Sequence, residues 1–416
     1  MKNMIKMSLV AAVAVAGLSS TVAAKPLEEA IKNVDVSGSV LYRYNDYSDD
    51  KNGKTKTDNA YKIAVSLKSK VNDYVTATVR VITADGLTNN GLTTLSTRND
   101  GKAATTDRDA NPSLHVSQAN FTVKTDVATV IAGKQGLTTP WTVAIDSDSE
   151  EQTGTGVLAL IPAGPVTVAA AYFNQTNLGN ATSKMGVDLT ATAGFGAEYT
   201  EAAVQGVVDD AVNSANIATV GVLGTAGPVA FDAWYLNLSD VFDSYTIGAK
   251  ATVDMFTAEL RYANLELEDE VTAYAIGHEG NTDNSIVIAK LGAKMDAFSA
   301  YLQYGMTDKD GGLTALDSDA KTTMTGWNTN IHDKADADYI RVGGGINVMS
   351  GLNVSINYAD LEYAGDMEES ELYTQITHKM GKNLVTYVRL GTYEVEEDGK
   401  DTVDATAGRL QVEYKF

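Results

Sequence analysis

The chain has 416 residues, a formal net charge of −22 and no cysteine, and 44% of its residues are apolar. This acidic balance repels nucleic acids and other polyanions and attracts cations, so it disfavours nucleic-acid binding. After residue 24 no apolar run reaches the roughly 18 residues that a membrane-spanning helix needs, which excludes a helical membrane protein. An exported chain without disulfides has to gain its stability from packing and from its sheet.

The N-terminal segment is typical of a signal peptide. Two lysines precede an apolar run over residues 9–18, and small residues follow as far as Ala24. The apolar run is too short to cross a bilayer as a helix. We therefore expect residues 1–24 to direct export and to be removed, and residues 25–416 to form a single domain.

From residue 34 onward, apolar and polar side chains alternate with a period of two, which is typical of β-strands with one apolar face. The alternation predicts strands over residues 34–46, 61–67, 75–81, 114–125, 127–135, 157–161, 166–174, 217–224, 229–238, 245–253, 256–266, 285–295, 298–307, 339–348, 352–363, 372–380, 384–395 and 405–416. In the last of these, Leu410, Val412 and Tyr414 alternate with charged or amide side chains. Such a final strand is explained most simply if it closes a barrel with lipid outside and water inside.

The connections between these strands alternate between long and very short. The short ones lie at residues 72–73, 126, 163–164, 254–255, 296–297, 349–351 and 381–383. Outer-membrane barrels have tight periplasmic turns, longer external loops and an even number of strands. We therefore predict an all-β fold, a transmembrane antiparallel β-barrel of about 18 strands. About 16 strands also fit, because the predicted bounds carry errors of a few residues.

Two of the long connections differ from the others. Residues 175–214 form the longest irregular stretch, which we expect to be a large external insertion. Residues 136–156 do not alternate and carry no base and four acids, which are Asp146, Asp148, Glu150 and Glu151. Irregular backbone is stable inside a water-filled barrel, where carboxylates form one wall of a selectivity filter. We interpret this stretch as an inward-folded constriction loop; a solvated external loop is the alternative.

Basic side chains on the lumen face would supply the opposite wall of such a constriction. Strand parity turns six of them inward, which are Arg43, Lys62, Arg80, Lys134, Arg341 and Arg409. Arg389 fits by position, although its parity is ambiguous. On the lipid face each of them would cost about 2–4 kcal/mol at mid-depth. Arg43 and Arg80 suit the height of the loop best, and the alternative for each arginine is a simple pair with a neighbouring acid. Opposed acidic and basic walls create a transverse field, and the net acidity then favours cations.

Asp146 and Asp148, with Glu150 close by, offer hard oxygen ligands at short spacing and are candidate ligands of a calcium ion. Residues 308–311 are a weaker candidate, and neither stretch has the full calcium-loop pattern. The four histidines are widely spaced, and no nucleophile or phosphate-loop motif is complete. We therefore expect no catalytic residue and no required cofactor.

The entry into the first strand reads KPLEEAIK at residues 25–32 and continues with VDVSG at 34–38. A second stretch reads GKQGLTTPWT at 133–142 and leads to GTG at 154–156. With the last strand, which ends on Phe416, these stretches resemble the major outer membrane porins of Campylobacter and related epsilonproteobacteria. The resemblance implies an 18-stranded, trimeric general porin with cation preference and a calcium ion near the constriction.

We therefore expect a passive diffusion porin for small hydrophilic solutes and cations in the bacterial outer membrane, and no enzyme. Its expected partners are outer-membrane lipid, lipopolysaccharide and further copies of itself as a homotrimer, without nucleic acid. A substrate-selective channel with a saturable binding site is the nearest alternative. A surface adhesin or structural barrel with a plugged lumen is another, which the insertion at 175–214 favours.

Overall fold

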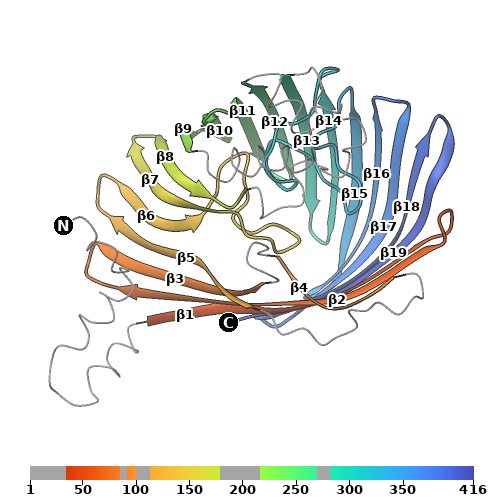
Figure 1. Cartoon of the computed structure of the whole chain (residues 1–416), viewed down its shortest axis with the longest axis horizontal. Coiled ribbons are helices and arrows are strands. Elements are labelled where there is room, and N and C mark those ends of the chain that lie inside the picture. Colours follow the sequence, from red (N-terminus) through yellow and green to blue (C-terminus); the bar gives the residue numbers. More distant parts are fainter. Residues whose placement is uncertain (1–33, 85–90, 100–112, 179–215, 269–281) are drawn as a thin grey trace, which may run out of the picture.

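The computed structural model describes residues 34–84, 91–99, 113–178, 216–268 and 282–416. The predicted signal peptide and nearly all of the predicted insertion at 175–214 lie outside these residues. Within them, the chain forms nineteen β-strands of one antiparallel sheet (Figure 1). The strands are β1 (Val34–Asp49), β2 (Lys54–Lys70), β3 (Val75–Ala84), β4 (Thr93–Asn99), β5 (Ser113–Lys124), β6 (Thr129–Gly136), β7 (Thr153–Ala163), β8 (Val166–Thr176), β9 (Ile217–Ala226), β10 (Val229–Leu238), β11 (Phe242–Val253), β12 (Phe256–Leu267), β13 (Asp283–Met295), β14 (Phe298–Thr307), β15 (Asp338–Met349), β16 (Leu352–Tyr363), β17 (Met367–Met380), β18 (Leu384–Glu397) and β19 (Lys400–Lys415).

The first and last strands close the sheet into a barrel. β1 and β19 pair antiparallel over eleven residues, from Ser39 opposite Lys415 to Asp49 opposite Ala405. Around the rest of the ring, the order of the strands follows their order along the chain. The barrel is therefore built mainly from hairpins of strands that follow one another along the chain.

β3 and β4 share one place in this ring. β2 pairs with β3 through residues 64–70 and with β4 through residues 56–61, and β3 pairs in turn with β5. The barrel therefore has 18 strand positions, which confirms the predicted fold. β4 itself lies in the connection between the predicted strands over residues 75–81 and 114–125, where we predicted no strand. That detail was wrong because the threonines of β4 favour a strand without producing an apolar alternation.

The two faces of the barrel wall differ in polarity as the alternation predicts. On β12, Leu260 is 59% exposed, whereas the adjacent Arg261 is 3% exposed. On β11, Tyr245 and Ile247 are likewise exposed, and Thr246 between them is buried. An exposed apolar band on alternate residues is unfavourable in water and favourable against hydrocarbon, so it identifies the lipid-facing side.

Tight hairpins join strands at both ends of the barrel. Asp254 and Asp296, with φ of 51° and 47°, adopt the left-handed conformation that short hairpin turns require. At the opposite end, Asp366 and Asp398 do the same with φ of 53° and 51°, although the sequence predicted longer loops there. The prediction failed at these turns because charged residues continue the strands, so no apolar alternation marks them.

Two connections fold into the barrel. They are residues 137–152, between β6 and β7, and residues 308–337, between β14 and β15, and we call them the first and second inner loops (Figure 1). An apolar cluster joins both to β8–β12, with Trp141 from the first loop and Leu316 from the second at its centre. The lumen is therefore partly filled by protein, whereas the sequence predicted only one inner loop.

Candidate pore constriction

Hydrogen bonds fix the course of the first inner loop. At its base the Leu137 N–H donates to the Gln152 carbonyl oxygen at 2.9 Å. The fully buried Trp141 reaches β11, where its Nε1 donates to Ser244 Oγ at 2.7 Å. The Asp146 carboxylate accepts the N–H of Glu150 at 2.8 Å, which closes the turn that carries the predicted acids. These acids consequently have defined positions inside the barrel.

β1 and β19 hold this loop through arginines. Arg43 Nη1 lies 2.8 Å from Asp148 Oδ1, and its Nη2 donates to the Ser147 carbonyl oxygen at 2.8 Å. The third nitrogen, Nε, donates to Gln411 at 2.8 Å, so all three nitrogens are used. From β19, Arg409 Nη1 lies 3.4 Å from the same Asp148 oxygen. Arg43 is 2% exposed, so it acts as a buried clamp on the loop.

β2 and β3 hold the loop through Glu151, which is completely buried. Arg80 donates to its carboxylate through Nη2 at 2.7 Å and through Nε at 3.1 Å, and Lys62 Nζ lies 3.1 Å away. Burial alone raises the pKa of Glu151, but the hydrogen bonds and charges of Arg80 and Lys62 outweigh burial and hold this pKa below its ordinary value. Glu151 is therefore ionised, and it offsets one of the two positive charges of Arg80 and Lys62.

These contacts change the expected arrangement of charges. The sequence predicted that the acids of the loop and the bases of the wall face one another across open water. Instead, Asp148 contacts Arg43, and Glu151 contacts Lys62 and Arg80. The ion pairs therefore fasten the loop to β1–β3, and they create no field across a gap at these positions.

Arg341 and Arg389 lie on the lumen face and take no part in these pairs, although Arg389 lies directly opposite Arg409 in the register of β18 and β19. Arg389 Nε donates to Gln375 on β17 at 2.8 Å, and its guanidinium lies 4.8 Å and 5.0 Å from the ring centroids of Tyr373 and Trp327. Its ambiguous parity is thus resolved as inward, because Trp327 belongs to the second inner loop. Among the residues described, no carboxylate lies at ion-pair distance from Arg341 or Arg389.

Lys134 does not belong to this lumen set. The register places it opposite Ala119 and Thr155, in the row that Val157 continues, and Val157 is 46% exposed on the outer face. Its Nζ donates to the Val116 carbonyl oxygen at 3.0 Å. The inward prediction for Lys134 was wrong because β6 carries apolar residues on both faces, so alternation does not decide which side faces the lumen.

Asp146 lies close to the second inner loop, whereas Asp148 forms ion pairs with Arg43 and Arg409. One carboxylate oxygen from each of Asp146, Asp317 and Asp319 lies within 4.8 Å of the other two, and we call this group the aspartate junction. Asp319 also accepts the Ser147 N–H at 2.6 Å, which draws the two loops together. Asp146 thus clusters with two aspartates of the second inner loop, and all three side chains are hard oxygen donors. Calcium binding by Asp146 and Asp148 stays a prediction.

The second inner loop also lies inside the lumen, and the sequence did not predict it. Residues 311–318 are all buried, and the Leu316 N–H donates to the Trp141 carbonyl oxygen at 2.8 Å. At its other side, Glu371 of β17 accepts the N–H groups of Trp327 and Asn328 at 2.7 Å each. The loop thus bridges the first inner loop and the opposite wall. Its sequence, rich in Asp, Thr and Gly, has the composition of an external loop and gave no signal of this position.

The family model described as Campylobacter major outer membrane protein matches residues 1–416, the whole chain. A comparison with curated proteins found no match. Within the described part of the chain, no helix has the length and apolar character needed to cross a membrane.

Solved structures of outer-membrane channels share the fold at low sequence identity. OpdL of Pseudomonas aeruginosa is 14% identical with a TM-score of 0.69, over 92% of this chain and 99% of that chain. OccAB3 of Acinetobacter baumannii is 13% identical with a TM-score of 0.67, over 92% and 99%. OpdK of P. aeruginosa, solved with vanillate, is 14% identical with a TM-score of 0.64, over 92% and 98%. At such identity the similarity establishes the barrel fold alone.

Proposed function

The chain belongs to the Campylobacter major outer membrane protein family and is an outer-membrane channel, and we propose that it is a general diffusion porin with a preference for cations. The observation that carries this proposal is the closed barrel of 18 strand positions with a charged lumen, since barrels of about 16–18 strands leave an aqueous channel. Cavities of 490 and 660 Å³ border the inner loops, and the lining of each includes charged side chains. Their size suits small hydrophilic solutes.

The proposed cation preference rests on the distribution of lumen charges. Asp148 and Glu151 form ion pairs with basic side chains of β1–β3, so these two carboxylates add no free negative charge to the lumen. The aspartate junction adds three further carboxylates where the inner loops meet. The net charge of −22 extends the same field over the whole molecule, which raises the local concentration of cations.

Calcium binding at the aspartate junction is a further part of the proposal. The donors are all carboxylates, and a bound divalent cation offsets their mutual repulsion and ties the two loops together. We expect EGTA to lower the thermal stability of the folded barrel, added calcium to restore it, and Asp317→Asn to abolish the response. If EGTA leaves both stability and conductance of the wild type unchanged, this part of the proposal is wrong.

Single-channel recording of the purified protein in planar bilayers tests the diffusion proposal. We expect open levels on the nanosiemens scale, with a conductance that rises in proportion to the conductivity of the salt solution. A protein that inserts and remains silent would favour the structural barrel or adhesin. The homotrimer and contact with lipopolysaccharide stay predictions, and cross-linking in intact membranes measures the number of associated copies.

A substrate-selective channel is the second candidate. It is favoured by Arg341 and Arg389, whose charges face the lumen without a carboxylate partner among the described residues. The fold shared with OpdK, which was solved with vanillate, is in keeping with it. A conductance that saturates with one class of solute, and not with others of similar size, would select this candidate over general diffusion.

A further inference from the structure

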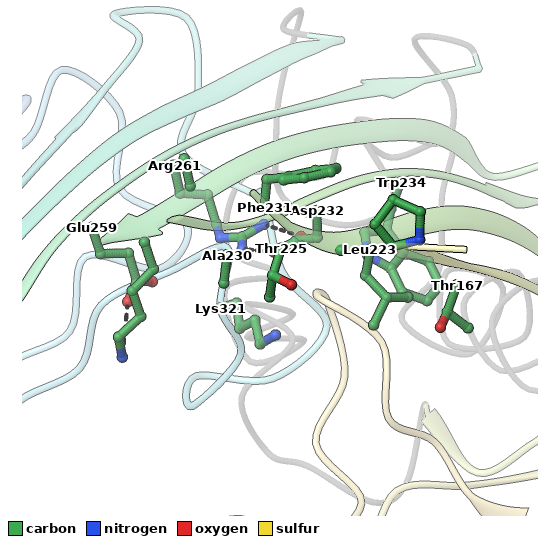
Figure 2. Close-up of a pocket in the computed structure, with 14 residues that line it drawn as sticks. Thr167, Leu223, Thr225, Ala230, Phe231, Asp232, Trp234, Glu259, Arg261 and Lys321 are labelled. Atoms are coloured by element: carbon green, nitrogen blue, oxygen red, sulfur yellow. Dashed lines mark hydrogen bonds and ion pairs between the residues drawn. The ribbon is translucent and has the colours of Figure 1, made fainter. Parts of the chain in front are cut away.

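A cavity of 490 Å³ lies in the lumen against β8–β12 (Figure 2), and Glu151 and its partners Arg80 and Lys62 do not line it. Its wall carries Trp234 and Leu223 together with the ion pair between Arg261 and Asp232, and Lys321 of the second inner loop reaches it. The volume lies within the range of about 300–1,000 Å³ of small-molecule sites. None of its lining residues belongs to the aspartate junction or to the basic wall of β1–β3, although Lys321 is two residues from Asp319.

Bare backbone lets two planar groups lie against the cavity wall. A Cβ at Gly221 would lie 2.1 Å from Cδ2 and 2.2 Å from Cε3 of the Trp234 indole, and one at Gly248 would lie 2.3 Å from Nη2 of Arg261. Glycine at position 221 therefore leaves room for the rigid indole against the sheet, and glycine at 248 leaves room for the guanidinium. The indole forms an apolar platform beside the cavity, and aromatic rings stack favourably on such a face.

The charged groups of the cavity leave one positive charge in excess. Arg261 donates to both carboxylate oxygens of Asp232, at 3.0 and 2.8 Å. Lys250 Nζ lies 3.7 Å from Glu259. Lys321, by contrast, is exposed and has no carboxylate at ion-pair distance among the described residues. A ligand with one negative charge therefore matches the charge of the cavity lining.

We propose that this cavity binds a small aromatic monocarboxylate, with its ring on Trp234 and its carboxylate at Lys321. The combination is selective because a neutral ring lacks the ion pair and an aliphatic acid lacks the stacked face. The proposal rests on the proposed channel function, since a solute reaches the cavity through an open lumen. It gives that channel a binding site for one class of anion within an acidic molecule.

Benzoate is the probe that tests this site, with benzyl alcohol and acetate as the neutral and aliphatic comparisons. In planar bilayers we expect benzoate to reduce the KCl current of the wild type in a saturable way, and neither comparison to do so at the same concentration. Lys321→Gln is expected to weaken the apparent affinity for benzoate by about tenfold or more, the equivalent of one charge-assisted contact. Lys321→Arg keeps the charge and is expected to retain the effect.

Lys379→Gln is the matched control, because Lys379 lines a different cavity, and its benzoate affinity is expected to equal that of the wild type. Isothermal titration of detergent-solubilised protein measures benzoate binding without a current, and heat-dependent gel migration verifies that each variant is folded. A wild type that conducts KCl but does not respond to benzoate, or a Lys321→Gln variant with unchanged affinity, would overturn this proposal alone. A wild type that binds benzoate in titration but carries no KCl current would support the site and overturn the diffusion porin.

Discussion

Two groups of basic side chains in the lumen have opposite kinds of partner. On β1–β3, Arg43, Lys62 and Arg80 contact carboxylates of the first inner loop. On β15 and β18, Arg341 and Arg389 contact amide and aromatic side chains, and no described carboxylate lies at ion-pair distance. The first set of charges holds a loop, and the second set has no acidic partner among the described residues. A lumen arginine therefore indicates a role in permeation only after its partners are known.

Glu151→Gln is expected to have the largest effect on the paired group. The substitution leaves Arg80 and Lys62 as buried cations without their carboxylate, which costs about 3–5 kcal/mol of stability. Thermal unfolding of the detergent-solubilised barrel measures this loss. Glu413→Gln is the control, because Glu413 also borders the lumen but pairs with the exposed Lys415, and its expected change is about 0–1 kcal/mol. Equal losses in the two variants would contradict the distinction between the two groups.

Acid is expected to act on the same contact. The pKa of Glu151 in the folded barrel lies below its ordinary value, so ionised Glu151 stabilises the fold. This contribution is complete above the unfolded pKa of about 4.3 and is lost as the pH falls through the lower folded pKa. Unfolding measured between neutral pH and about pH 3 should show a steeper acid decline in the wild type than in Glu151→Gln. Parallel declines would mean that other groups dominate.

Arg389→Gln tests the unpaired group and is expected to change selectivity more than stability. A unit charge about 8 Å from a passing ion in water is worth about 0.5 kcal/mol, with opposite sign for a cation and an anion. Its removal should therefore raise the cation-to-anion permeability ratio about fivefold. The lost ring contacts are expected to cost about 0.5–2 kcal/mol of stability. Lys51→Gln, at an exposed hairpin pair with Asp401, is the control and should leave the permeability ratio unchanged. If both variants shift the ratio equally, the location of the charge is irrelevant.

The strands and the inward direction of most lumen bases could be predicted from the sequence. Lipid penalises charge on one face of the wall, so alternation alone turns Arg43 and Arg80 inward. Alternation does not give the height of a side chain in the barrel or the path of a loop. Arg80 and Glu151, which are 71 residues apart, therefore meet in a way that no local pattern could predict. Alternation also failed for Lys134, because its strand is apolar on both faces and the pattern does not show which face is inward.

The second inner loop could not be predicted for a different reason. A polar segment remains hydrated outside the barrel and also inside a wet lumen, so its composition is the same in both places. What directs residues 308–337 inward is a small set of distant contacts, including those with Trp141 and Glu371. Asp317 and Asp319 of the aspartate junction belong to that loop. Their position beside Asp146 could therefore not be predicted from the sequence either.

The reversal potential of the wild-type channel across a KCl gradient tests most directly whether the lumen charge that remains after pairing is negative. We predict a potential of cation sign at low salt, which declines toward 1 M KCl as the Debye length shrinks to about 3 Å. A potential of anion sign would contradict this claim.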